Sequence, residues 1–359
     1  MLVLSCAPRG SFTSVPPGSD SVVPETIFVG TSRALGPEGF TRDRADVASF
    51  VRYDISIPPD REPGEVNLPP RSRKPDVAKD FLMLAETRFD APEEFRGALR
   101  EALKARGQTD AIVYVHGFNN TMAEGVYRVA QMHHDLQVPG LAVHYAWASR
   151  GSALGYVYDR DSVMFGRAGF ERLLDEVAAS GAKNIVIVAH SMGAILTMEA
   201  LRQMTLRGNS RVLSRINGVV LISPDLDVDL FRSQARDIGV LPQPFVIFGS
   251  TDDKVLNLSA KLSGAPERLG NLDDVSRIAD LKVTYFDTAA FDVGAGHFNL
   301  TTSPALLKLF GGIVGIDQAF RADERARVGL LPGIVLTVRN ATEIVLAPVG
   351  AIAEAGRRP

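Results

Sequence analysis

The chain has 359 residues, of which 45% are hydrophobic, 23% charged and 7% aromatic. These globular proportions exclude a chain that is disordered throughout, and the length favours one elaborated α/β domain. The formal net charge of -3 is too close to neutral for attraction to phosphate to dominate binding, so nucleic acid is not an expected partner. A single cysteine excludes intrachain disulfides and thiolate zinc clusters, and no apolar run is long enough to cross a bilayer.

The N-terminal region, residues 1–25, is expected to be a flexible tether because residues 7–25 are rich in Pro, Ser and Gly. Cys6 follows Val3-Leu4-Ser5, a pattern that resembles the processing box of bacterial lipoproteins, in which the cysteine is lipidated. Too few residues precede it for a signal peptide, so we expect the given start to lie inside a longer one. Two localisations stay open: a periplasmic or membrane-anchored lipoprotein, and a cytoplasmic enzyme with an incidental cysteine.

The expected elements change in character along the chain. Strands are predicted over 26–30, 51–57 and 81–85, with a Pro-rich crossing at 58–75 and a helix at 92–106. Beyond residue 110, continuous apolar strands alternate with amphipathic helices; the strands are 111–116, 141–147, 184–190, 218–223, 245–250 and 282–287, and the helices are 121–136, 160–180 and one that ends near 207. This alternation predicts an α/β fold with a mostly parallel sheet, helices on both faces and a site at the carboxyl ends of the strands.

The strongest chemical signal is Ala189-His190-Ser191-Met192-Gly193, between an apolar strand and a helix. A GxSxG-type nucleophile elbow needs small residues two positions before and after the serine, because the strand-to-helix turn crowds those backbones. Ala189 and Gly193 meet this need. Ser191 is therefore the candidate nucleophile, and the Met192 N–H is a candidate oxyanion donor. The alternative is an ordinary turn with a serine at the helix N-cap.

A nucleophilic serine needs a base, and α/β hydrolases have the chain order serine, acid, histidine. Of the six histidines, only His297 follows Ser191, so it is the candidate base. His133 and His134 are adjacent on a predicted helix and are expected at the surface.

The second oxyanion donor is expected in the loop after the strand at 111–116, where the Phe118 N–H is the candidate. His116 ends that strand and is expected to form structural hydrogen bonds rather than to transfer protons. Trp147 is expected in the core rather than in the wall of the site.

The acid is expected just after the strand at 245–250, where Asp252 and Asp253 are adjacent. We expect one carboxylate to face His297 and the other to cap the next helix, and we favour Asp253 as the acid, with Asp252 as the alternative. Asp225 and Asp227, which follow the preceding strand, are further options.

Several segments resemble a bacterial α/β-hydrolase family long described as of unknown function. They are VGTSR, SIPPDREPGEVNLP, VYVHGFNNTMAEGVYRVAQMHHDL, YAWASRGSALGYVYDRDS, IVAHSMGA and STDDKVLNLS, and the resemblance covers about 26–310. The family's DxALxLS element begins at Asp253 here, with Val in place of Ala, and its late GHxY-type element is Gly296-His297-Phe298-Asn299. The resemblance implies an α/β-hydrolase fold and a serine triad but no substrate.

We therefore divide the chain into an N-terminal tether, an α/β-hydrolase domain over 26–312 and a C-terminal extension over 313–359. The strands expected at 218–223 and 245–250 are too close in sequence to enclose a large helical cap, so we expect an open site. The intervening segment is expected only to line its rim.

The predicted function is a serine hydrolase that acts on small-molecule or lipid carboxylic esters through an acyl-enzyme. Ser191 would attack, His297 would carry the proton, Asp253 would orient the imidazole, and the Phe118 and Met192 N–H groups would hold the oxyanion. No metal or nucleotide cofactor is expected, because the sequence contains no HExxH, GxxxxGK[ST] or strand-linked GxGxxG motif. The alternative is a non-catalytic, envelope-associated binding protein on the same fold.

Overall fold

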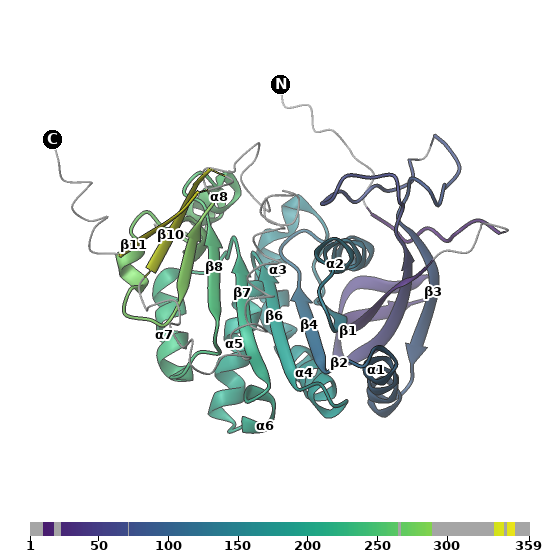
Figure 1. Ribbon diagram of the computed structural model, residues 1–359, viewed down its shortest axis with the longest axis horizontal. Helices are drawn as coiled ribbons and strands as arrows, with labels where there is room; N and C mark the ends of the chain where they lie inside the picture. Colours follow the sequence, from purple (N-terminus) through teal and green to yellow (C-terminus); the bar gives the residue numbers. More distant parts are fainter. Residues whose placement is uncertain are drawn as a thin grey trace.

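The computed structural model describes residues 10–17, 23–70, 72–264, 267–288, 334–340 and 343–348. Its sheet has the strand order β11-β10-β9-β8-β7-β6-β4-β5-β1-β2-β3 (Figure 1). The strands are β1 (Glu25–Gly36), β2 (Gly39–Ser56), β3 (Leu82–Phe89), β4 (Asp110–Val115), β5 (Leu141–Ala146), β6 (Asn184–His190), β7 (Ile216–Ile222), β8 (Phe245–Gly249), β9 (Thr284–Asp287), β10 (Ile334–Asn340) and β11 (Glu343–Pro348). The α-helices are α1 (Pro92–Arg106), α2 (Met122–Leu136), α3 (Tyr156–Phe165), α4 (Arg167–Ala179), α5 (Gly193–Leu206), α6 (Ser210–Leu213), α7 (Val228–Ile238) and α8 (Lys254–Ser263).

The centre of the sheet is parallel, as predicted. β1, β5, β4, β6, β7, β8, β9 and β10 pair in parallel, whereas β1–β2, β2–β3 and β10–β11 are antiparallel. Because the central strands are parallel, their carboxyl ends lie at one edge of the sheet. β10 and β11 extend this same sheet, although their residues fall in the predicted C-terminal extension.

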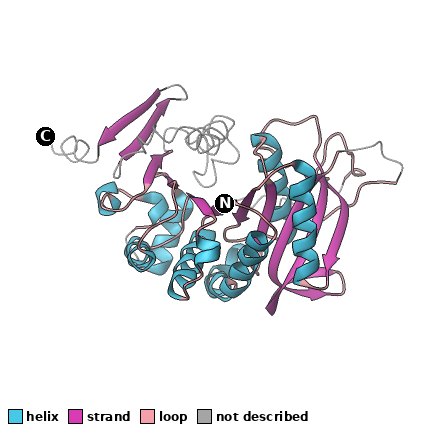
Figure 2. Cartoon of the chain, turned by 60° about the horizontal axis from the view of Figure 1, so that its bottom comes forward, coloured by secondary structure: helices cyan, strands magenta, loops and turns pink. Residues whose placement is uncertain are grey.

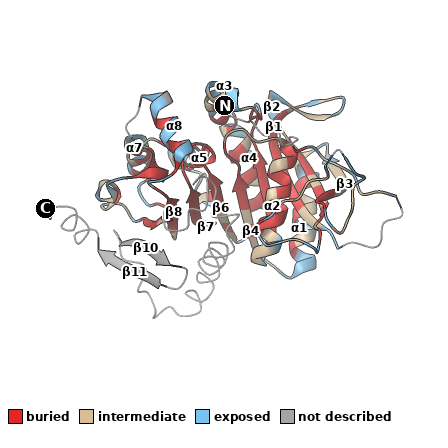
Figure 3. Ribbon diagram, turned by 90° about the horizontal axis from the view of Figure 1, so that it is seen from above, coloured by how far each residue is buried: buried red, intermediate tan, exposed pale blue. Residues whose placement is uncertain are grey.

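Helices cover both faces of the sheet. On one face, α1, α4, α5 and α7 pack on a core that includes Phe95, Leu173 and Leu201; Figure 2 shows the helices of this layer side by side. On the other face, α2 packs through Val126 and Ala130. Figure 3 shows that buried residues line the strands and the inner sides of the helices. Burial of each large apolar side chain contributes about 1.5–3 kcal/mol, so the two layers hold the central strands firmly.

Three predicted elements differ from the structure. The strand predicted over 51–57 is the end of β2, which has 18 residues and begins at Gly39. The short strand predicted over 26–30 is the start of the long β1, which pairs with β2 through a turn at residues 37–38; Gly39, the first residue of β2, has a φ of 114°. The helix predicted over 160–180 is two helices that meet at Gly166. A methyl group at Gly166 would lie 3.2 Å from Trp147 Cβ, so the chain comes too close to the end of β5 for larger residues to fit comfortably there.

Part of the predicted tether is packed on the domain. The Gly10 N–H donates to Glu124 Oε1 at 3.0 Å, Ser14 forms a β-bridge with Met83, and the Phe12 ring stacks on Tyr53 with centroids 4.5 Å apart. Residues 10–17 thus gain backbone partners on an edge strand and an aromatic contact. These contacts offset the conformational entropy that the segment, rich in Pro, Ser and Gly, loses when it becomes ordered.

The absence of a large cap between β7 and β8 is confirmed. The segment contains α7, whose Phe231 and Ala235 are buried in the core with the residues of α5. The expectation that it only lines the rim is therefore wrong, because its apolar face completes a helical layer. Among the described residues, the structure has no helix long and apolar enough to cross a membrane.

Candidate active site

Ser191 stands in a strained turn between β6 and α5. Its φ is 52°, in the left-handed region that costs a non-glycine residue about 1–3 kcal/mol. Two backbone hydrogen bonds fix this turn to β7 and the residues after it: the Ser191 N–H donates to Ile222 O at 3.0 Å, and the Asp225 N–H donates to Ser191 O at 3.2 Å. Ser191 is 3% exposed, so the turn buries nearly all of this residue.

Glycines allow the turn to pack against the end of β4. A methyl group on Gly193 would lie 2.6 Å from Val115 O and 2.7 Å from His116 O, and one on Gly117 would lie 2.7 Å from Ser191 Cβ. The helix α5 therefore begins directly beside the loop that follows β4. This is the crowding that the small residue after Ser191 was predicted to relieve.

Two backbone N–H groups flank Ser191. Met192 follows it at the N-terminus of α5, and Phe118 follows Gly117, which packs so close to Ser191 that a methyl group there would not fit. Within the described part of the chain, neither N–H donates a hydrogen bond to another residue. Backbone N–H groups of this kind can stabilise a negative oxygen when they point at the same atom.

His116 has the structural role expected of it. Its ring is fully buried and stacks on Trp147, with Nδ1 2.8 Å from Gly117 O and Nε2 3.1 Å from Trp147 O. Burial lowers the pKa of His116 well below its ordinary value. Trp147 is also fully buried and donates its Nε1–H to His116 O at 2.7 Å, which confirms its assignment to the core.

The surface prediction holds for only one of the adjacent histidines. His134 is exposed, but the side chain of His133 is only 10% exposed, and its Nδ1 lies 2.8 Å from Glu25 Oε1. The register of α2 turns His133 toward β1, which sequence spacing alone could not reveal.

The candidate base, His297, lies outside the residues that the structure describes, as does Cys6. The candidate acid can be placed. Asp253 is fully buried, and its Oδ1 accepts the N–H groups of Val255 and Leu256 at 3.0 Å. Asp252 is exposed. Asp253 itself therefore caps the helix. We expected one of the two carboxylates to cap it and the other, with Asp253 favoured, to face the histidine; the assignment of the cap to Asp252 is wrong.

The two further candidate acids, Asp225 and Asp227, bind other groups. Asp227 caps α7. Asp225 is buried, and it accepts hydrogen bonds from Ser259 Oγ at 2.5 Å and Tyr156 Oη at 3.1 Å. Its Oδ1 also lies 3.2 Å from Nε of the buried Arg268. Asp225 thus joins α3, α8 and the end of β7 beside the Ser191 turn.

Sequence analysis missed a polar cluster behind the loop that carries Phe118. Arg33, Ser149 and Asp159 are all buried and hydrogen-bond to that loop. Their only signal was their place inside the segments VGTSR, YAWASRG and YDRDS that carry the family resemblance. Among the residues that the structure describes, no group of three or more His, Cys, Asp or Glu could hold a metal ion.

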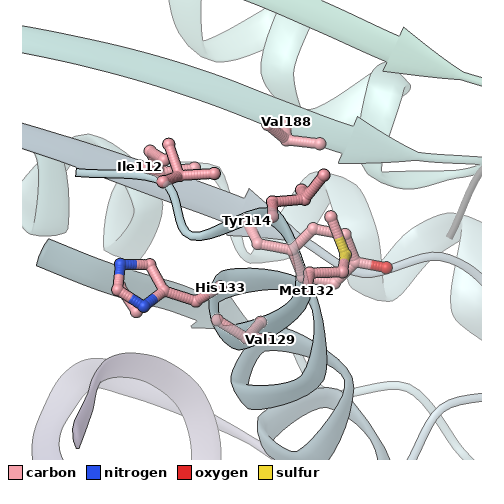
Figure 4. A pocket seen from close by; sticks show the side chains of 9 residues that line it. Ile112, Tyr114, Val129, Met132, His133 and Val188 are labelled. Carbon is pink, nitrogen blue, oxygen red and sulfur yellow. The ribbon is translucent and has the colours of Figure 1, made fainter. Parts of the chain in front are cut away.

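In the described part of the structure, three hollows border α2: one of about 700 Å³ lies at its start, beside Phe12 and Tyr53, and two more lie farther along the helix. One of about 20 Å³, lined mainly by apolar side chains of α2 and the strands beneath it, is just large enough for a water-sized probe (Figure 4). The other, of about 310 Å³, has the size of a small-molecule site. Its lining residues are Val66, Leu68, Tyr114, Asn120, Glu124, Tyr127, Arg128 and His190. It therefore adjoins the residue that precedes Ser191.

Solved structures with similar folds include several esterases. Esterase B from Lactobacillus rhamnosis has 14% identity and a TM-score of 0.37, over 60% of this chain and 80% of that one. Esterase 2 from Thermogutta terrifontis has 14% identity and a TM-score of 0.34, over 78% and 90%. The Pyrobaculum calidifontis esterase has 12% identity and a TM-score of 0.35, over 64% and 94%. Such low values say nothing about substrate.

No curated protein matches the chain. A family model does, over residues 91–294, which include β4, the Ser191 turn and the Asp253 cap. The match spans more than half of the chain, and the sheet has the parallel centre and two helical layers that the family's name implies. The protein therefore belongs to the family of alpha/beta hydrolases of unknown function, DUF900.

Proposed function

We propose that this protein is a serine hydrolase that cleaves carboxylic esters, with Ser191 as nucleophile, His297 as general base and Asp253 as the carboxylate that orients the histidine. The observation that carries the proposal is the backbone of Ser191, which is held at a φ of 52° between a parallel strand and a helix. Such strain persists only where the surrounding structure imposes it, and it occurs most often at functional sites.

The reaction would proceed in two halves. Ser191 Oγ attacks the ester carbonyl carbon and passes its proton to His297, while the Phe118 and Met192 N–H groups hold the oxyanion. The tetrahedral intermediate expels the alcohol, which takes the proton from His297, and leaves an acyl-enzyme. Water gives a proton to His297 and attacks the acyl carbon, and the second tetrahedral intermediate then releases the acid and expels Ser191 Oγ, which takes the proton back from His297.

Asp253 is supported as the acid by its environment. A carboxylate that orients a histidine works best when it is buried and fixed, and Asp253 is buried and tied to α8 by two N–H groups. Asp252 stays the alternative, although it is exposed. Asp225 already accepts two hydroxyl donors and contacts an arginine.

A fluorophosphonate probe tests the nucleophile. It should label the wild type and not Ser191→Ala. Ser223→Ala is a matched control, because Ser223 also has a positive φ, of 43°, and is nearly buried at the end of the neighbouring β7; this variant should be labelled normally. Equal labelling of wild type and Ser191→Ala would refute the assignment. A wild type that neither reacts with the probe nor hydrolyses any member of a panel of acyl esters would instead support a non-catalytic binding protein.

We also propose that Cys6 is lipidated, on the strength of the Val3-Leu4-Ser5-Cys6 pattern. Because residues from Gly10 onward are packed on the domain, a lipid on Cys6 would hold the domain within about 14 Å of the membrane surface along the chain. Mass spectrometry of the N-terminal peptide from native protein tests this: acyl chains support it, and an unmodified thiol contradicts it.

A further inference from the structure

A buried carboxylate accepts a backbone hydrogen bond from the loop between β4 and α2. Asp159, in α3, accepts the Asn119 N–H at 3.2 Å and the Ser149 hydroxyl at 2.6 Å through Oδ2, and the Arg150 N–H at 2.7 Å through Oδ1. Burial raises the pKa of Asp159, and its three hydrogen bonds oppose that shift. Asn119 has a φ of 59°, so Asp159 binds the loop at the residue where its backbone is strained.

A buried arginine holds the same loop one residue later. Arg33, in β1, is 1% exposed and donates through Nη2 to Asn120 O at 2.9 Å and through Nη1 to Ser149 O at 3.1 Å. Burial lowers the pKa of Arg33 to about 10, which still leaves it charged at neutral pH, and Asp159 partly offsets the effect. Burying this cation is costly unless its hydrogen bonds are well formed.

Ser149 links the two charged groups. Its Oγ donates to Asp159 and accepts the Asn120 N–H at 3.1 Å, which closes a network over three separate segments of chain. Within this segment, His116 Nδ1 lies 2.8 Å from Gly117 O, and the Asn120 side chain donates to Phe118 O at 3.4 Å. The backbone is therefore fixed on both sides of Phe118.

We propose that Asp159 and Arg33 are positioning residues for the oxyanion donor at Phe118, an inference that rests on the proposed serine hydrolase function. Gly117 packs against Ser191, so any movement of this loop changes the distance from the Phe118 N–H to the reacting oxygen. A preorganised donor stabilises the transition state only while its geometry is fixed, and a small displacement removes much of its effect. Neither side chain needs to touch the substrate.

The test compares Asp159→Asn and Arg33→Met with a matched control, Asp80→Asn. Asp80 is also fully buried and accepts two bonds from Arg73, but it lies beside β3 at the far edge of the sheet. Both positioning variants should lose at least about tenfold in kcat with KM within about threefold. Arg33→Lys, which keeps the charge and one donor nitrogen, should lose less than Arg33→Met. Asp80→Asn should lose stability and keep its kcat.

A trifluoromethyl ketone provides a readout that a purely structural role would not change. It forms a tetrahedral adduct with the serine whose oxygen occupies the oxyanion site, so its inhibition constant should rise by the same factor as kcat/KM falls in each positioning variant. Unchanged kcat in Asp159→Asn and Arg33→Met, or an equal loss in Asp80→Asn, would overturn the inference. If Asp159→Asn fails to fold, Ser149→Ala removes the link and leaves the carboxylate in place. Normal hydrolysis by Ser191→Ala, or a wild type inert to the fluorophosphonate probe, would overturn the proposed function itself, and this inference with it.

Discussion

Replacing Gly193 by alanine should force α5 away from β4. The added methyl group would lie 2.6 Å from Val115 O and 2.7 Å from His116 O, whereas carbon atoms usually approach a carbonyl oxygen to about 3.3 Å. Both obstacles are backbone atoms in or next to a central strand, so the helix must retreat by roughly 0.6 Å. Overpacking of this kind costs about 1–3 kcal/mol. With an unfolding entropy of about 2.1 cal/mol/K per residue, this corresponds to roughly 1.5–5 °C in Tm for a domain of this size.

The same shift should lower activity, because the Met192 N–H would move with the start of α5. We expect kcat to fall at least about tenfold, measured by ester hydrolysis and by the rate of fluorophosphonate labelling. Gly97→Ala is the matched control: Gly97 lies in α1 with nothing within 4 Å of the added methyl, so alanine should stabilise the protein by about 0.5–1 kcal/mol and leave kcat unchanged. If Gly193→Ala keeps both the Tm and the kcat of the wild type, the packing argument for the turn is wrong.

Three further predictions concern the acid, the buried histidines and the open site. Asp253→Asn should keep most of the stability, because asparagine caps helices as well as aspartate does, but it should lower kcat by about 10³-fold or more. Asp252→Asn should keep kcat within about twofold. If steady-state assays show the larger loss in Asp252→Asn, Asp252 is the acid. Burial lowers the pKa of His144 to about 3 and that of His116 well below its ordinary value. The unfolded chain therefore binds more protons than the folded chain below about pH 6.5. His144 should lower the stability by up to about 1.4 kcal/mol per pH unit between about pH 6.5 and 3, and His116 should add to the loss as the pH falls below about 6.5. Urea unfolding from pH 7 to 4 measures this slope, and an equally steep slope in His144→Asn would contradict the assignment to that residue. Because no large cap lies between β7 and β8, the rate on a long-chain ester should rise smoothly through its critical micelle concentration, and an abrupt jump there would indicate a mobile lid.

Much of the fold could be predicted because its signals are local. The apolar run at 184–190 indicates a buried strand from its own composition and length, and the small residues around Ser191 are required by a turn of only a few residues. The position of Asp253 directly before a helix likewise predicted a cap nearby, but not that the buried carboxylate would itself be the cap.

Contacts between residues far apart in sequence were determined only by the tertiary structure. Residues 10–17 pack because Phe12 meets Tyr53, and His133 is mostly buried because α2 turns it toward β1. The network behind Phe118 joins Arg33, Ser149 and Asp159 across more than a hundred residues of chain. The spacing of apolar residues and the composition of a segment indicate which of its residues face the protein interior. A hydrogen bond between buried polar groups depends instead on which segments the fold brings together. The sequence alone could not reveal this network for that reason.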